Sequence, residues 1–117
     1  MKRLIFVMLL LAGCSANTTE PLHVTISASK VELESFEPVT ITALITYQNE
    51  PILEGAEVEF ELINVDGKSL GSVNPTNDGN GSYSIETSFD GTGIYKIISH
   101  VSYEQYHEMP EVEVELK

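Results

Sequence analysis

The chain has 117 residues, enough for one small domain, and a formal net charge of −12 from 6 cationic and 18 acidic side chains. Such an acidic chain has no basic surface for phosphates, which excludes nucleic acid as a partner, and anionic lipid would repel its surface. Because it has a single cysteine, it forms no internal disulfide.

Residues 1–13 have the layout of a secretory signal peptide. Lys2 and Arg3 precede the apolar run LIFVMLLL, which is too short to span a bilayer of about 30 Å. The following LAGC resembles the lipobox of bacterial lipoproteins, in which the cysteine becomes the first residue and receives a diacylglyceryl group. This predicts lipid on Cys14, a lipidated tether over 14–20, and a domain over 21–117 held at the extracytoplasmic face of the cell membrane. The alternative is a lone cysteine that follows a signal peptide by chance.

Removal of the leader takes away Lys2 and Arg3 and changes the net charge from −12 to −14. The protein surface is then strongly anionic, so contact with the membrane would depend on the acyl anchor at Cys14. The simplest interpretation of most of this charge is solubility, although an acidic surface also favours cations near it.

Beyond the tether, apolar and polar residues alternate with a period of two, which is typical of half-buried β-strands. Strands are predicted in LHVTISA, PVTITALITY, AEVEFELI, GSYSIETSF, GIYKIISHVSY and EVEVELK, and KSLGSV is a candidate for a shorter seventh. Turn motifs separate them at NEPILEG, DGK, NPTNDGNG and DGTG. Six to seven strands at this spacing predict an all-β domain, an immunoglobulin-like antiparallel β-sandwich.

Tyr95 follows the glycine turn DGTG near the start of the penultimate predicted strand. This position resembles the tyrosine corner of Greek-key sandwiches, whose phenol binds back to a nearby backbone group. Tyr83 has a similar setting one strand earlier, after GNGS. We expect both tyrosines to serve the fold.

The stretch ISHVSYEQYHEMP, residues 98–110, holds His100, His107 and Met109. The alternation in GIYKIISHVSY places His100 on the outer face of the sheet. The alternation in EVEVELK, extended backwards along the chain, places His107 and Met109 on the same face. A hairpin that pairs Ser102 with His107 and His100 with Met109 satisfies both patterns. Opposed Cβ atoms are then about 5 Å apart and diagonal ones roughly 7 Å. The three side chains are therefore predicted to converge on one exposed face.

Imidazole and thioether without thiolate suit copper, above all Cu(I), better than zinc or a hard cation. Zinc usually takes cysteine or three to four His and carboxylate ligands, and calcium takes a loop of oxygens. NPTNDGNG offers oxygens without the EF-hand spacing, so we interpret it as a turn, with a calcium loop as the alternative. Because three ligands leave the shell incomplete, His23, outward on the first strand, is the candidate fourth ligand. The alternative for the whole set is chance content of a hairpin, with Met109 packed beneath the turn.

Four segments of the chain are similar to the YtkA-like domain, often labelled FixH-like, of secreted lipoproteins of bacilli. They are EPLHVTISASK, EPVTITALITYQNEPILEGAEVEFEL, GNGSYSIETSFDGTGIYKIISHV and HEMP, and the resemblance extends over about residues 20–117. It implies an extracytoplasmic copper metallochaperone that supplies a cytochrome c oxidase subunit. His100 matches the histidine before the hairpin, and His107 and Met109 match the H-x-M after it. A methionine commonly precedes that second histidine in the family, and here Tyr106 takes its place.

A different class of function is a non-catalytic interaction module that binds a protein or cell-wall partner through its hairpin tips. Tyr103 and Tyr106 flank the predicted tip YEQY, and exposed tyrosines suit such contacts. We do not expect an enzyme, because the chain has no GxSxG, phosphate loop or HExxH, and Cys14 is committed to lipid.

Overall fold

The computed structural model describes residues 21–117, in which it has eleven β-strands and no helix. Within that range, accordingly, no helix is long and apolar enough to cross a membrane. The predicted signal peptide, the lipidation at Cys14 and the tether lie outside the described residues.

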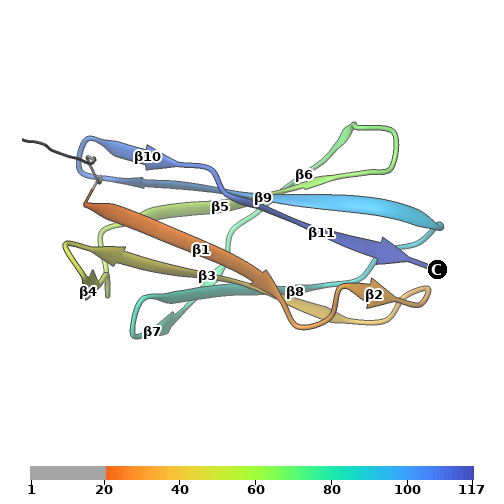
Figure 1. The fold of residues 1–117 in the computed structure, drawn as a ribbon, viewed down its shortest axis with the longest axis horizontal. Helices are drawn as coiled ribbons and strands as arrows, with labels where there is room; N and C mark the ends of the chain where they lie inside the picture. Colours follow the sequence, from red (N-terminus) through yellow and green to blue (C-terminus); the bar gives the residue numbers. More distant parts are fainter. Residues whose placement is uncertain (1–20) are drawn as a thin grey trace, which may run out of the picture.

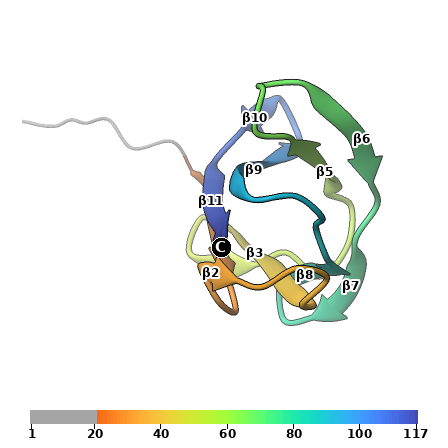
Figure 2. The same ribbon diagram turned by 90° about the vertical axis from the view of Figure 1, so that its right-hand side faces the viewer.

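The strands form two sheets that pack face to face as a sandwich, seen end-on in Figure 2. The first sheet has the order β1 (Leu22–Ala28), β3 (Val39–Tyr47), β8 (Ser82–Thr87) and β7 (Thr76–Gly79), with β4 (Glu50–Pro51) paired to β3. The second has the order β2 (Glu32–Leu33), β11 (Glu111–Leu116), β9 (Gly93–Tyr103), β5 (Glu57–Ile63) and β6 (Ser69–Val73), with β10 (Tyr106–Glu108) paired to β9. All pairs are antiparallel except that of β2 with β11.

The predicted all-β sandwich is confirmed, but the number of strands was underestimated. Three of the additional strands, β2, β4 and β10, have only two or three residues. The motif NPTNDGNG, predicted as a turn, also contributes β7, because Thr76 and Asn77 pair with β8 before the chain reverses at Asn80 and Gly81. Gly81 has a φ of +81°, and a Cβ there would lie 2.7 Å from the carbonyl oxygen of Ile45, so this turn requires glycine.

The core lies between the two sheets and follows the predicted alternation. In β9 the odd-numbered residues from Tyr95 to Val101 are buried, and in β11 the even-numbered Val114 and Leu116 are buried. The complete buried apolar set is Leu22, Leu33, Val39, Ile41, Ala43, Ile45, Ile52, Phe60, Tyr83, Ile85, Phe89, Tyr95, Ile97, Val101, Val114 and Leu116. Every member of this set lies within the described residues 21–117.

Both tyrosines expected to serve the fold are buried and hydrogen-bonded to backbone. The Tyr95 hydroxyl lies 2.8 Å from the carbonyl oxygen of Gly91 and also bonds that of Asp90, which confirms the tyrosine corner. Its ring stacks on Phe89 with centroids 4.4 Å apart. The Tyr83 hydroxyl donates to the carbonyl oxygen of Ile52 at 3.0 Å, and burial raises the pKa of this phenol.

We expect Tyr95→Phe to lower the free energy of unfolding by about 1 kcal/mol, because the hydroxyl of this buried side chain no longer binds the carbonyl groups of the turn at Asp90 and Gly91. Urea unfolding followed by circular dichroism measures the change. Tyr106→Phe is the matched control, since the hydroxyl of Tyr106 makes no hydrogen bond within residues 21–117. Equal stability of parent and Tyr95→Phe would contradict the role of this corner.

Ser99 is the exception in the buried face of β9. It is fully buried opposite Phe60, and its hydroxyl has no hydrogen-bond partner in the described part of the chain. An unpaired buried hydroxyl costs about 1–3 kcal/mol. We therefore expect Ser99→Ala to raise the free energy of unfolding by about 1 kcal/mol in the same assay, and a loss of stability would show that the hydroxyl has a partner.

Candidate metal centre

The β9–β10 hairpin has the predicted register. Tyr106 pairs with Tyr103 and His107 with Ser102, across a turn in which Glu104 has a φ of +55°. The same register continues beyond β10, where the N–H of Ser99 donates to the carbonyl oxygen of Pro110 at 2.8 Å and β11 pairs with β9. Met109 lies between β10 and β11, and in this register it faces His100.

The three predicted metal-ligating residues lie on the outer face of the second sheet. The His100 side chain is 30% exposed, His107 is exposed, and Met109 is 55% exposed. The two imidazole centroids are 6.4 Å apart. With metal–nitrogen bonds of about 2.0–2.1 Å and ring nitrogens about 1 Å from their centroids, an ion shared by both rings would hold the centroids at most about 6.2 Å apart, so a small side-chain movement would bring both rings to one ion. The hairpin therefore brings two imidazoles to one face of the sheet, and Met109 follows His107 by two residues with an exposed side chain.

Each histidine has one ring nitrogen fixed by a neighbour. His100 Nε2 lies 3.0 Å from Glu61 Oε1, and His107 Nδ1 lies 2.7 Å from Ser102 Oγ. Histidines that bind metals commonly use one nitrogen for the metal while the other bonds a carboxylate, carbonyl or water, which orients the ring. In this arrangement the metal would take His100 Nδ1 and His107 Nε2.

Glu61 is held by two partners. The hydrogen bond from His100 and, next, one from Ser69 lower the pKa of its carboxyl, against the opposing effect of burial. The carboxylate therefore stays ionised and can orient the His100 ring. Glu61 lies on β5 as the register partner of Ile98, two residues along the strand from Glu59, which is the register partner of His100.

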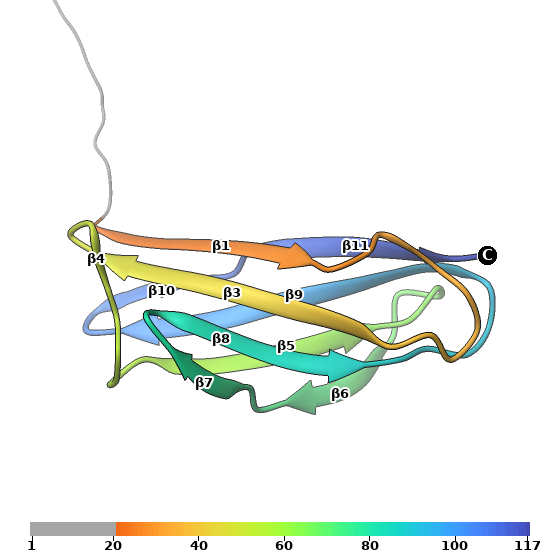
Figure 3. The ribbon, with the colours of Figure 1, turned by 90° about the horizontal axis from the view of Figure 1, so that it is seen from below.

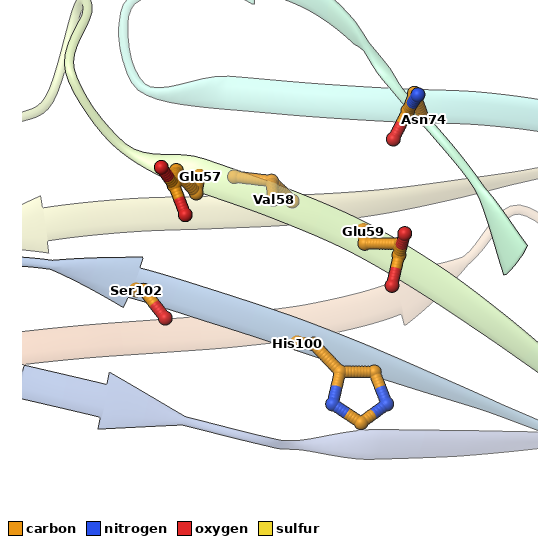
Figure 4. Close-up of a pocket in the computed structure, with 6 residues that line it drawn as sticks. All are labelled: Glu57, Val58, Glu59, Asn74, His100 and Ser102. Atoms are coloured by element: carbon orange, nitrogen blue, oxygen red, sulfur yellow. The ribbon is translucent and has the colours of Figure 1, made fainter.

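A shallow hollow of about 330 Å³ lies beside His100 on this face. Figure 4 shows His100 and Ser102 on β9, Glu57 and Glu59 on the adjoining β5, and Asn74 after β6. Glu59 is the register partner of His100, and Glu57 that of Ser102. Two carboxylates of β5 therefore lie beside the imidazole, on the edge of β9 that does not pair with β10.

The proposed fourth ligand, His23, is not part of this arrangement. It is exposed on β1 in the other sheet, opposite Thr46. Among residues 21–117, no group of three or more His, Cys, Asp and Glu side chains is placed to hold a metal ion. The described residues thus show two histidines and a thioether, and no ready-made site of the kind that zinc or calcium uses.

The alternative calcium segment uses its oxygen atoms internally. Asp78 Oδ2 accepts a hydrogen bond from Ser84 Oγ at 2.5 Å, and Asn77 Oδ1 accepts one from the N–H of Gly79 at 3.0 Å. Asn77 Nδ2 donates to the carbonyl oxygen of Leu53 at 2.8 Å. These bonds fix a strand and its turn, in agreement with the interpretation of NPTNDGNG as structural.

The predicted contact tyrosines are less exposed than expected. Tyr103 and Tyr106 are half-buried and pack against the core, and Tyr47 of β3 joins them. The Tyr47 ring lies 4.9 Å from that of Tyr103 in an edge-to-face arrangement and 6.0 Å from that of Tyr106. Tyr47, Glu59 and Glu61 were not predicted as site residues, because only the order of the strands brings them beside the hairpin.

No protein-family model matches the chain, and no curated protein matches its sequence. Among solved structures, the chain is similar to the soluble domain of PmoD from Methylocystis sp. ATCC 49242 (Rockwell), with a TM-score of 0.55 and 14% sequence identity. The match covers 87% of this chain and 95% of that one. At this identity the similarity shows a shared sandwich fold over nearly the whole described domain.

The lowered pKa of Glu61 predicts a pH dependence of stability. Its carboxylate stabilises the folded chain above the ordinary glutamate pKa of 4.5, and this contribution is lost as the pH falls through the lowered value. Between about pH 5 and pH 3, the urea midpoint should fall less in Glu61→Gln than in the parent. Glu113→Gln, at an exposed position of β11, is the control and should keep the parent's slope. Parallel slopes for Glu61→Gln and the parent would show that Glu61 is not held as described.

Proposed function

We propose that this chain is a lipid-anchored, extracytoplasmic copper-binding protein that carries Cu(I) on its β9–β10 hairpin. The observation that carries the proposal is the register of this hairpin, which sets the ring centroids of His100 and His107 6.4 Å apart on one face, with the exposed Met109 two residues after His107. Two imidazoles and a thioether match the preference of Cu(I) among biological metals. The YtkA-like resemblance supports the same metal and names cytochrome c oxidase as the destination.

The donor set suits a carrier better than a permanent site. The three donors are at least partly exposed, and the described chain adds no third histidine and no cysteine to close the shell. An acceptor protein can therefore approach the ion and supply the remaining ligands. Glu57, Glu59 and Glu61 line the same sheet face, where their negative field would raise the local concentration of cations.

Tyr106 does not remove a ligand from this face. Successive residues of a strand point to opposite faces, so Tyr106 lies opposite Tyr103 and turns its ring toward Tyr47, while His107 faces outward. A methionine at position 106 would occupy the tyrosine side of the hairpin. The departure from the family pattern is therefore compatible with copper held by His100, His107 and Met109.

The place where the chain enters the domain supports a role close to the membrane. The N–H of Gln48 donates to the carbonyl oxygen of Pro21 at 2.9 Å, and Figure 1 shows β1 starting at the same end of the sandwich as the β9–β10 turn. If Cys14 carries lipid, residues 15–20 could extend to about 20 Å at most. The hairpin would then stay close to the membrane surface, where a membrane-bound oxidase subunit could receive the copper.

A second candidate function is a non-catalytic interaction module. The observation that favours it is the cluster of Tyr47, Tyr103 and Tyr106, since half-buried tyrosines with accessible edges are common in protein contacts. The two functions are compatible, because the metal donors and the tyrosines occupy opposite faces of the same hairpin.

We expect the chain of residues 15–117, which lacks Cys14 and retains all described core residues, to bind one Cu(I) in anaerobic competition with a chromogenic chelator. The His100→Ala, His107→Ala double variant should lose affinity by about tenfold or more, and Met109→Leu should weaken Cu(I) more than Cu(II) because the thioether is the soft donor. His23→Ala is the matched control and should bind like the parent. A double variant with the parent's affinity would refute the assignment.

A further inference from the structure

Charged side chains are distributed unevenly along the sandwich. The four cationic residues of the described chain are Lys30, Lys68, Lys96 and Lys117, and three of them pair with glutamates near β2, β11 or the chain end. The end formed by residues 47–57 and 100–109 has no lysine or arginine in either segment. The two segments instead carry five glutamates, so the formal charge of this part of the described chain is strongly negative. These glutamates are Glu50, Glu54, Glu57, Glu104 and Glu108.

A groove of about 490 Å³ opens at this anionic end. Figures 1 and 3 show β4 and the β9–β10 turn at this same end, opposite the C-terminus. The groove lies between the 47–54 segment and Tyr103, with Gly55 packed against the Tyr103 ring. Its lining consists of two aromatic rings, three aliphatic side chains, two carboxylates and one amide: Tyr47, Tyr103, Pro51, Ile52, Leu53, Glu50, Glu54 and Gln48.

This combination favours a cation with an apolar stem. The faces of tyrosine rings attract cations within about 6 Å of the centroid, and desolvation strengthens the attraction. Burial and then the neighbouring Tyr106, Glu104 and Tyr103 raise the pKa of Tyr47, so its phenol stays neutral and keeps its ring available to a cation. Leu53 is 58% exposed and offers an apolar surface for a methylene chain.

Arginine fits these features better than lysine does. Its guanidinium is planar, stacks on aromatic rings, is weakly hydrated, and can bind a carboxylate through two parallel hydrogen bonds. An ammonium group is more strongly hydrated and gains less from a tyrosine face. A second copy of the chain is an unfavourable occupant, because two such anionic ends would repel each other.

We propose that the groove lined by residues 47–54 and Tyr103 binds an arginine side chain on a basic segment of a partner protein. Tyr103 adjoins Ser102, whose hydroxyl bonds His107, so a partner held here lies next to the candidate metal centre. The groove does not contain the metal donors, and arginine binding requires no metal. The proposal thus stands independently of copper binding and, if copper is carried, specifies how a basic acceptor docks beside it.

The test uses the metal-free full chain in non-ionic detergent and fluorescence anisotropy of labelled peptides at physiological salt. The peptides are Gly/Ser chains with three arginines, three lysines or three citrullines at the same positions. We expect the arginine peptide to bind several-fold more tightly than the lysine peptide, and citrulline, which keeps the shape without the charge, to show no binding at the same concentrations.

Two sets of variants locate the binding. Tyr47→Leu with Tyr103→Leu should raise the dissociation constant of the arginine peptide by about five- to tenfold. Glu50→Gln with Glu54→Gln, both at exposed positions, should raise it several-fold. The control, Glu86→Gln with Glu113→Gln, makes the same change in net charge at exposed positions outside the groove and should leave it unchanged.

The proposal would be overturned if the groove double variant and the control double variant weakened peptide binding equally, since net charge alone would then explain binding. Equal affinities for the arginine and lysine peptides would overturn the choice of guanidinium. Displacement by tetramethylammonium, where sodium chloride of equal ionic strength has no effect, would identify a small organic cation as the occupant instead. The His100→Ala, His107→Ala variant should bind the peptide like the parent, which separates this outcome from that of copper binding.

Discussion

The pairing of β9 on both sides is the constraint on which the rest of the molecule depends. β5 lies along one side of β9, and β10 followed by β11 lies along the other. Since successive side chains alternate between faces, one register buries Ile97 and Val101 and turns His100 outward. A slip of one residue would expose the core and bury the metal donors. Stability of the fold therefore selects the same register that the candidate site requires.

The hairpin at the end of β9 separates two chemistries by the same alternation. Its outer face carries His107 beside Ser102, and its opposite face carries Tyr106 beside Tyr103. A substitution at one position thus acts on one face only, which allows the tyrosine side to change without loss of a metal ligand.

Local features of the fold and site could be predicted from the sequence, whereas features that depend on strand order could not. The pairing of His107 with Ser102 follows from the alternation of two strands joined by a short turn. Glu61 reaches His100 only because β5 is the neighbour of β9, although the two residues are separated by 39 positions. The segment around Asn77 shows a second limit of prediction from sequence. Its residues are typical of a turn, yet they form a strand because they pair with β8. The place of His23 in the opposite sheet likewise depends on topology.

The negative net charge is distributed unevenly over the domain. Three of the four described lysines pair with glutamates, whereas the carboxylates near the hairpin face no cationic side chain in segments 47–57 and 100–109. A metal cation and a guanidinium are attracted by the same field, yet they need different immediate partners, imidazole with thioether in one case and tyrosine with carboxylate in the other. The two faces of the hairpin provide these partners separately. If both proposals hold, one anionic end would carry a metal ion and a basic partner at the same time without competition for ligands.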